Sequence, residues 1–150
     1  MVDDNYNLKV ADFGFATYVA EKANHSKLRL LNSYRGTKTY MAPEIRKQMW
    51  YDGRQVDTFS TGVILFILVV GIFPFSAAKD SDYFYELLNE DQDKYWSTVG
   101  GDDLTPEFKD LMIKMLSANP ENRPTIEELK AHAWVNGSQQ INKSSMIYEE

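Results

Sequence analysis

The sequence predicts a mainly α-helical fold with one short strand near its N-terminus. An apolar stretch from Asp57 to about Val70 predicts one helix, because it is longer than an ordinary strand. A second stretch places apolar residues at the i, i+3, i+4, i+7 and i+8 positions, which is the spacing of one helix face. These residues are Phe108, Leu111, Met112, Met115 and Leu116. Near the N-terminus, Leu8 and Val10 alternate with other residues as in a half-buried strand.

Composition limits the class of protein. The chain has 150 residues, of which 43% are hydrophobic, so it can bury a core. Its net charge of -6 argues against nucleic acid as a partner. There is no cysteine, and the two histidines, His25 and His132, are too far apart in sequence to suggest a metal cluster. The absence of cysteine and of a visible signal peptide favours an intracellular, cytoplasmic protein.

The strand at Leu8 and Val10 leads directly to Asp12. From Phe15 to about Tyr40 the sequence shows no sustained periodicity and is rich in Ser, Thr, Asn, Lys and Arg. We therefore expect a long exposed segment there, and loops of this length in compact domains are usually functional.

The predicted helix from Asp57 to about Val70 is apolar on nearly every face, so we expect other elements to surround it. Gly71 and Pro74 should end it. Its uninterrupted apolar run, Val63 to Val70, is shorter than a membrane span requires, so we expect a core helix and no membrane partner.

Three further helices are predicted in the C-terminal half. One covers Asp82 to Asn89 and is followed by EDQDKYW, an acidic surface turn that carries an aromatic anchor. The next begins at Thr105, with a proline at its first position. Thr125 and Glu128 form a capping box for the last helix, which runs to about Trp134. Residues 135–150 contain few apolar residues, and we expect a flexible tail.

Several short motifs follow one another in a fixed order. They are Asp12-Phe13-Gly14, Gly36-Thr37, Tyr40, Ala42-Pro43-Glu44, Asp57, Gly62 and Arg123. Each alone is a weak signal, but their order and spacing resemble the C-terminal part of the eukaryotic protein kinase domain, from the D-F-G strand onward. The resemblance covers residues 1–134 and points to the serine/threonine class. The ending HAWVNG is similar to one common in the calcium/calmodulin-dependent group.

The resemblance implies roles for the residues at these positions. Asp12 would ligate the magnesium that bridges the phosphates of ATP. Phe13 would pack toward the other lobe, and Gly14 would let the backbone turn. Thr37 would support catalysis through hydrogen bonds to the aspartate and lysine of the catalytic loop.

Three more residues would have structural roles in such a domain. Glu44 would pair with Arg123, 79 positions later, and fasten the activation segment to the helical lobe. Asp57 would accept hydrogen bonds from the backbone of the catalytic loop. By the same resemblance, the stretch from Phe15 to Tyr40 of this chain corresponds to the activation segment of the family.

Ser33 is the leading candidate for a regulatory phosphosite. It lies three residues before Gly36, where family members often carry a phosphate that orders the segment by pairing with Arg or Lys. The alternative is an ordinary solvated serine, and Ser26, Tyr34 and Thr39 are weaker candidates for phosphorylation.

The 150 residues contain no glycine-rich loop, strand lysine, helix glutamate or H-R-D-x-x-x-x-N loop, all of which the family needs to bind ATP and transfer phosphate. We therefore expect this span alone to be inert and to bind no cofactor. It is either part of an ATP-dependent serine/threonine kinase that phosphorylates proteins, or a non-catalytic binding module acting through the helical surface around Tyr83 to Trp96. In either case a protein partner could cover the surface left by the missing half.

Overall fold

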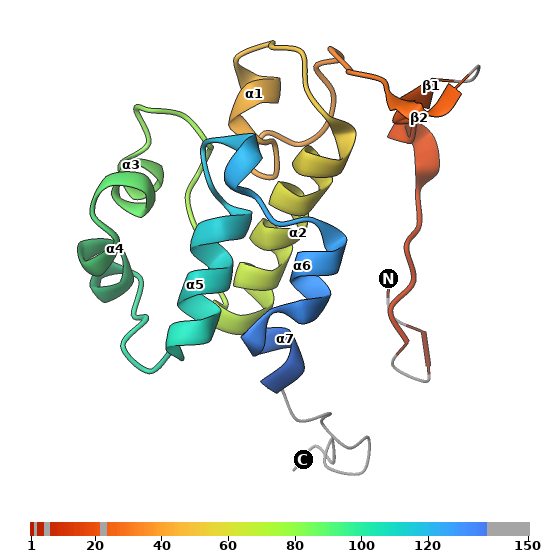
Figure 1. The fold of residues 1–150 in the computed structure, drawn as a ribbon. Coiled ribbons are helices and arrows are strands. Elements are labelled where there is room, and N and C mark those ends of the chain that lie inside the picture. Colours follow the sequence, from red (N-terminus) through yellow and green to blue (C-terminus); the bar gives the residue numbers. More distant parts are fainter. Residues whose placement is uncertain (2, 5–6, 22–23, 138–150) are drawn as a thin grey trace.

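The computed structural model describes residues 1, 3–4, 7–21 and 24–137 (Figure 1). The described chain has two parts, which we call the N-terminal arm, residues 1–40, and the helical body, residues 41–137. The described helices of the body are α1 (Pro43–Arg46), α2 (Gly53–Val70), α3 (Tyr83–Glu90), α4 (Gln92–Thr98), α5 (Pro106–Met115), η2 (Pro120–Asn122), α6 (Ile126–Ala131) and α7 (Ala133–Gly137). The mainly helical prediction is confirmed.

Helix α2 is the central element of the body, and α5 packs directly against it (Figure 1). It begins four residues before the predicted start, because the Asp52 side chain caps it by accepting a hydrogen bond from Arg54 N at 2.9 Å. It ends, as predicted, at Gly71, which has a left-handed φ of 84°. Gly62 permits close packing with α5, since a Cβ there would lie 2.9 Å from Met115 Cβ.

The expectation that other elements surround α2 on every side is only partly met. Phe59, Val63 and Phe66 are buried, but Leu68 is 76% exposed and Ile64 is half exposed among the described residues. By length and composition alone α2 could cross a membrane, and the core helix of a globular protein meets the same test.

The acidic turn predicted after α3 is wrong, because those residues form helix α4. The Asp91 side chain caps the helix by accepting from Lys94 N, and this local bond has the geometry of an ordinary N-cap. Tyr95 and Trp96 point inward and are buried against Phe66. The Tyr95 hydroxyl donates to the Pro74 carbonyl oxygen at 3.1 Å, so this aromatic cluster connects α4 to the turn that follows α2.

The C-terminal helix signals are confirmed in most details. Thr105 caps α5, and Thr125 with Glu128 forms the capping box of α6. The last predicted helix is divided in two at His132, whose backbone is extended. The His132 ring accepts a hydrogen bond from Trp134 N at 3.2 Å and lies 2.9 Å from an Asp110 carboxylate oxygen, so α7 starts in a new direction. Of the predicted tail, residues 138–150 lie outside the described residues.

The N-terminal arm runs outside the helical bundle (Figure 1). Its Leu8 and Val10, predicted to be half-buried in a strand, are 79% and 81% exposed. Among the described residues, backbone hydrogen bonds join Met1 with Lys9 and Asp3 with Asn7. The arm then contains a short 3-10 turn, η1 (Phe13–Phe15), and an antiparallel hairpin of β1 (Ala20–Glu21) and β2 (Asn24–Leu28) inside the segment predicted to lack periodic structure.

Candidate functional site

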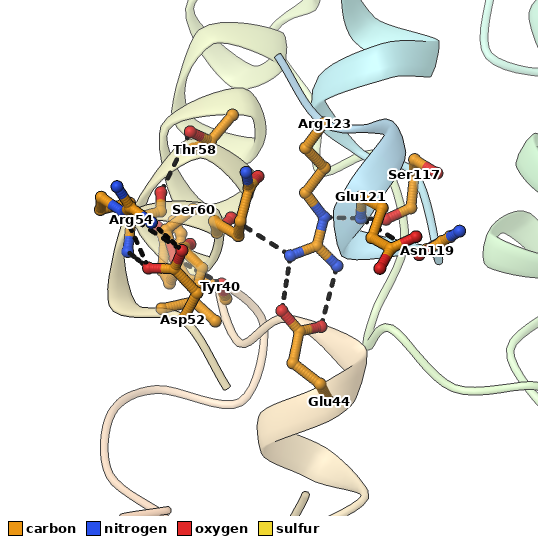
Figure 2. Close-up of polar contacts among 12 residues, drawn as sticks. Tyr40, Glu44, Asp52, Arg54, Thr58, Ser60, Ser117, Asn119, Glu121 and Arg123 are labelled. Atoms are coloured by element: carbon orange, nitrogen blue, oxygen red, sulfur yellow. Dashed lines mark hydrogen bonds and ion pairs between the residues drawn. The ribbon is translucent and has the colours of Figure 1, made fainter. Parts of the chain in front are cut away.

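A buried ion pair joins Glu44 of α1 to Arg123, which follows η2 (Figure 2). Arg123 Nη1 lies 2.6 Å from Glu44 Oε1, and Nη2 lies 2.8 Å from Oε2. The two side chains are 0% and 6% exposed. This is the fork-to-fork geometry in which a guanidinium and a carboxylate make two parallel hydrogen bonds, and it makes the contact directional as well as strong.

The remaining donors of Arg123 reach two other segments. Its Nε donates to the Ser117 carbonyl oxygen at 2.9 Å, and Nη1 also donates to the Gln55 carbonyl oxygen at 3.1 Å. The guanidinium lies 4.9 Å from the centre of the Phe59 ring, within the range of a cation–π contact. One arginine therefore connects α1, the start of α2 and the turn after α5, and its buried charge is fully partnered.

Asp12 lies in the exposed arm, in a left-handed backbone conformation with φ of 61°. Aspartate tolerates this region better than most residues because its short polar side chain can bond locally, and the Asp12 carboxylate accepts from Gly14 N at 3.2 Å. Phe13, next to it, is 70% exposed. Within the described part of the chain, the carboxylate has no cationic partner.

Magnesium at Asp12 would need more ligands than this one carboxylate supplies. This ion takes six oxygen ligands and is usually held by one or two protein carboxylates together with waters and substrate phosphates. The described residues contain no group of three or more His, Cys, Asp or Glu side chains arranged to hold a metal. Asp12 thus fits the role of a single carboxylate ligand, and the other ligands would have to come from the nucleotide, from water or from residues outside the described chain.

Thr37 and Asp57 line the same cavity, of about 300 Å³, between the arm and the start of α2. Partial burial, together with the nearby charge of Asp52, raises the pKa of the Asp57 carboxyl. No described residue donates a hydrogen bond to that carboxylate. The cavity therefore contains an acceptor whose charge is not compensated within the described residues.

Ser33 is attached to the body by Tyr51, a contact that we did not foresee from the sequence. The Tyr51 hydroxyl donates to the Ser33 carbonyl oxygen at 2.9 Å, and the two hydroxyls are 3.1 Å apart. Leu31 and Tyr51 also form an isolated antiparallel bridge. No motif marks Tyr51, so the only signal was its aromatic character just before a helix cap.

The two ends of the predicted site are thus differently built. Glu44 and Arg123 lie together in the core, whereas Asp12, Phe13 and Gly14 lie in the arm and have few contacts with the body.

The family model described as the protein kinase domain matches residues 1–135. The chain belongs to the protein kinase family.

Serine/threonine kinases are among its relatives. It is 35% identical over 135 residues to CBL-interacting serine/threonine-protein kinase 10 of Arabidopsis thaliana. This match covers 89% of this chain and 26% of that protein. It is 34% identical over 144 residues to CBL-interacting protein kinase 11 of Oryza sativa subsp. japonica, covering 95% of this chain and 26% of the relative. A probable serine/threonine-protein kinase, MARK-B of Dictyostelium discoideum, is 34% identical over 137 residues, 91% of this chain and 18% of the relative.

The chain spans about a quarter of the length of the first two of these relatives, 26% in each case. Most of each relative therefore has no counterpart in the 150 residues compared. Protein kinases as a family use ATP and magnesium and act on protein substrates.

Proposed function

We propose that this chain is the activation-segment and C-terminal-lobe part of an ATP-dependent serine/threonine protein kinase, and that it is inert by itself. The observation that supports this most is the state of Asp12 within a chain of this family. Its carboxylate accepts a single backbone hydrogen bond and has no ion pair with a described residue, so it remains available to a metal. The group would supply one magnesium ligand, and the magnesium would neutralise charge on the transferred phosphate.

The other matched residues would then act as supports. Glu44 and Arg123 would hold the activation segment to the helical body, because their buried pair crosses from α1 to the turn before α6. Asp57, with its raised pKa and uncompensated carboxylate, would receive backbone donors from a catalytic loop that these 150 residues lack. Thr37 lines the same cavity and would contact that loop.

Ser33 would carry the regulatory phosphate. Its hydroxyl lies 3.1 Å from the Tyr51 hydroxyl, and a phosphate on Ser33 Oγ would replace this contact with a dianion. The segment from Leu31 to Ser33 would then change its attachment to the body. Phosphorylation of Ser33 would in this way change how the segment is ordered.

The test uses the protein encoded by the complete reading frame. Purified protein should phosphorylate a protein substrate with Mg-ATP, and Asp12→Asn should lower the rate by several orders of magnitude while thermal stability stays unchanged. Arg54→Ala is a matched control, because Arg54 is exposed and, among the described residues, its ion pair is with Asp52 at the start of the same helix. Turnover that Asp12→Asn leaves intact would contradict the proposal. A reading frame without any upstream glycine-rich loop, lysine and H-R-D motif would favour the non-catalytic binding module instead.

A further inference from the structure

Two side chains at the start of α7 attach this helix to α5. The Trp134 ring packs on the Phe108 ring, with 5.4 Å between the ring centres. The side chain of His132, the residue before α7, is 11% exposed, and its Nε2 lies 2.9 Å from Asp110 Oδ2. These contacts hold α7 against α5, and α7 also packs on α6 (Figure 1).

The hydrogen bonds of His132 fix the position of its ring proton. Nδ1 accepts a hydrogen bond from Trp134 N at 3.2 Å, so this nitrogen carries no proton. A neutral imidazole has one N–H group, which is therefore on Nε2 and is donated to Asp110. The arrangement requires a neutral ring, because an imidazolium has N–H groups on both nitrogens and no acceptor.

Asp110 stays charged over the pH range in which a histidine titrates. Its Oδ2 also accepts from Lys114 Nζ at 2.6 Å, and this bond, with a weaker one from His132, keeps the pKa of the Asp110 carboxyl below its usual value. The ordinary pKa of histidine is about 6.5, and that of aspartate is about 3.9. Between about pH 7.5 and about pH 5.5 the ring is therefore the member of this contact that changes charge.

Other charged groups near the ring come from three elements and the turn between two of them. They line one cavity of about 360 Å³ together with His132, and they are Lys114 of α5, Glu121 of η2, Arg123 and Glu128 of α6. Arg123 is already paired with Glu44, and the cavity contains charges of both signs. These charges do not replace the specific contact between Nδ1 and Trp134 N that protonation would remove.

We propose that His132 is a pH-sensitive switch that holds α7 against α5 near neutral pH and releases it when Nδ1 becomes protonated. Protonation replaces the acceptor of Trp134 N with a second donor, so two N–H groups would face each other. The ion pair gained with Asp110 compensates little, because that carboxylate is 51% exposed and is shared with Lys114.

The released form of α7 therefore binds the proton more tightly than the packed form, and falling pH favours release. Release would separate Trp134 from Phe108, which is 1% exposed in the packed form. The inference does not depend on the kinase function, because it concerns only the packing of α7.

NMR of the 150-residue chain tests the switch without any substitution. Long-range proton–nitrogen correlation near neutral pH should find the His132 ring proton on Nε2. The protection of the Trp134 amide against hydrogen exchange, corrected for intrinsic exchange, should fall about tenfold from about pH 7.5 to about pH 5.5, since one hydrogen bond is lost. The Glu128 amide donates to the Thr125 hydroxyl, which does not titrate in this range, so it is an internal control and should keep its protection.

His132→Asn separates the switch from other effects of pH. Its side-chain oxygen can accept from Trp134 N two residues later, as in an ordinary Asx turn, and it does not titrate. The Trp134 amide should then stay protected at both pH values. Asp110→Asn keeps the histidine ring, so in this variant the protection should still fall with pH.

A neutral ring with its proton on Nδ1 would overturn the proposal, as would a Trp134 amide whose protection in the unsubstituted chain does not change with pH. An equal fall in His132→Asn, once circular dichroism has shown that this variant is folded, would also overturn it.

Discussion

The helical body and the N-terminal arm differ in where their apolar side chains lie. In the body, aromatic residues such as Phe59, Phe66 and Tyr95 are fully buried, whereas Phe13 and Phe15 in the arm are each 70% exposed. The body therefore contains the contacts that stabilise the fold, and the arm contains the residues that the family uses for chemistry. The contacts that stabilise the fold and the motif proposed to bind metal are therefore located in separate parts of this chain.

The buried Glu44–Arg123 pair connects these two parts, since α1 directly follows the arm. Exposed apolar side chains such as Phe13 and Leu68 form surfaces that single folded proteins usually cover. We therefore expect substitutions at buried positions of the body to be costly, and substitutions at the exposed residues around Phe13 to change stability little.

Arg123→Ala should have the largest effect on the free energy of unfolding. It leaves the Glu44 carboxylate buried without its partner, and such a loss costs about 3–5 kcal/mol. Urea unfolding followed by tryptophan fluorescence measures the change. Arg54→Ala, which removes an exposed arginine, should cost no more than about 1 kcal/mol. Equal costs for the two substitutions would show that the buried pair has no special role.

Phe66→Ala tests the difference in stability between the body and the arm at an uncharged side chain. Phe66 is 0% exposed and contacts Tyr95 and Trp96, so its truncation should leave a cavity and cost about 3–5 kcal/mol. Phe13→Ala in the arm should change the free energy of unfolding by less than about 0.5 kcal/mol. A large loss for Phe13→Ala would mean that the Phe13 ring packs on the body in solution.

Gly62→Ala should have an intermediate effect. The added methyl would lie 2.9 Å from Met115 Cβ and 3.1 Å from Leu116 Cδ2, so α2 and α5 would have to separate slightly. Overpacking of this kind costs about 1–3 kcal/mol. Gly137→Ala is the control, because nothing lies within 4 Å of a Cβ there. Thermal denaturation of both variants should separate them, and an unchanged midpoint for Gly62→Ala would refute the close packing.

Asp110→Asn should have the smallest effect, and the effect should depend on pH. The hydrogen bond from Lys114, and a weaker one from His132, hold the pKa of the Asp110 carboxyl below its usual value. Its stabilising contribution is therefore present above the pKa of the unfolded chain and is lost as pH falls through the lower folded value. We expect Asp110→Asn to cost about 0.5 kcal/mol near pH 7, because the carboxylate is half exposed, and almost nothing once the pH is well below the lowered pKa of the folded carboxyl. A cost that stays constant across this range would contradict the linkage.

The body could be predicted from sequence mainly where local signals decide the structure. Thr105 and the capping box of Thr125 and Glu128 mark helix starts through bonds to nearby backbone groups, and the structure has them. Helix α4 was missed, although its aromatic anchor was recognised and Asp91 provides a local cap. The sequence of this acidic stretch resembles a turn, and the burial of Tyr95 and Trp96 against Phe66 holds it as a helix on the core.

The candidate site also has a part that could be predicted from the sequence and a part that could not. Spacing and resemblance pointed to Glu44 and Arg123, which lie together in the structure although 79 residues separate them. The Ser33–Tyr51 contact was not foreseen, because it depends on how an irregular loop lies against the body. Loops without periodicity give no sequence signal for such placement.

Titration of the 150-residue chain with Mg-ATP by isothermal calorimetry tests the central claim most directly, namely that the chain has the metal-ligand aspartate but not a working site. A single carboxylate cannot hold a nucleotide, since most of the site's binding and positioning comes from groups absent from these residues. We predict no measurable heat of binding up to millimolar nucleotide and no phosphate transfer. Saturable binding with turnover, both abolished by Asp12→Ala, would contradict the account.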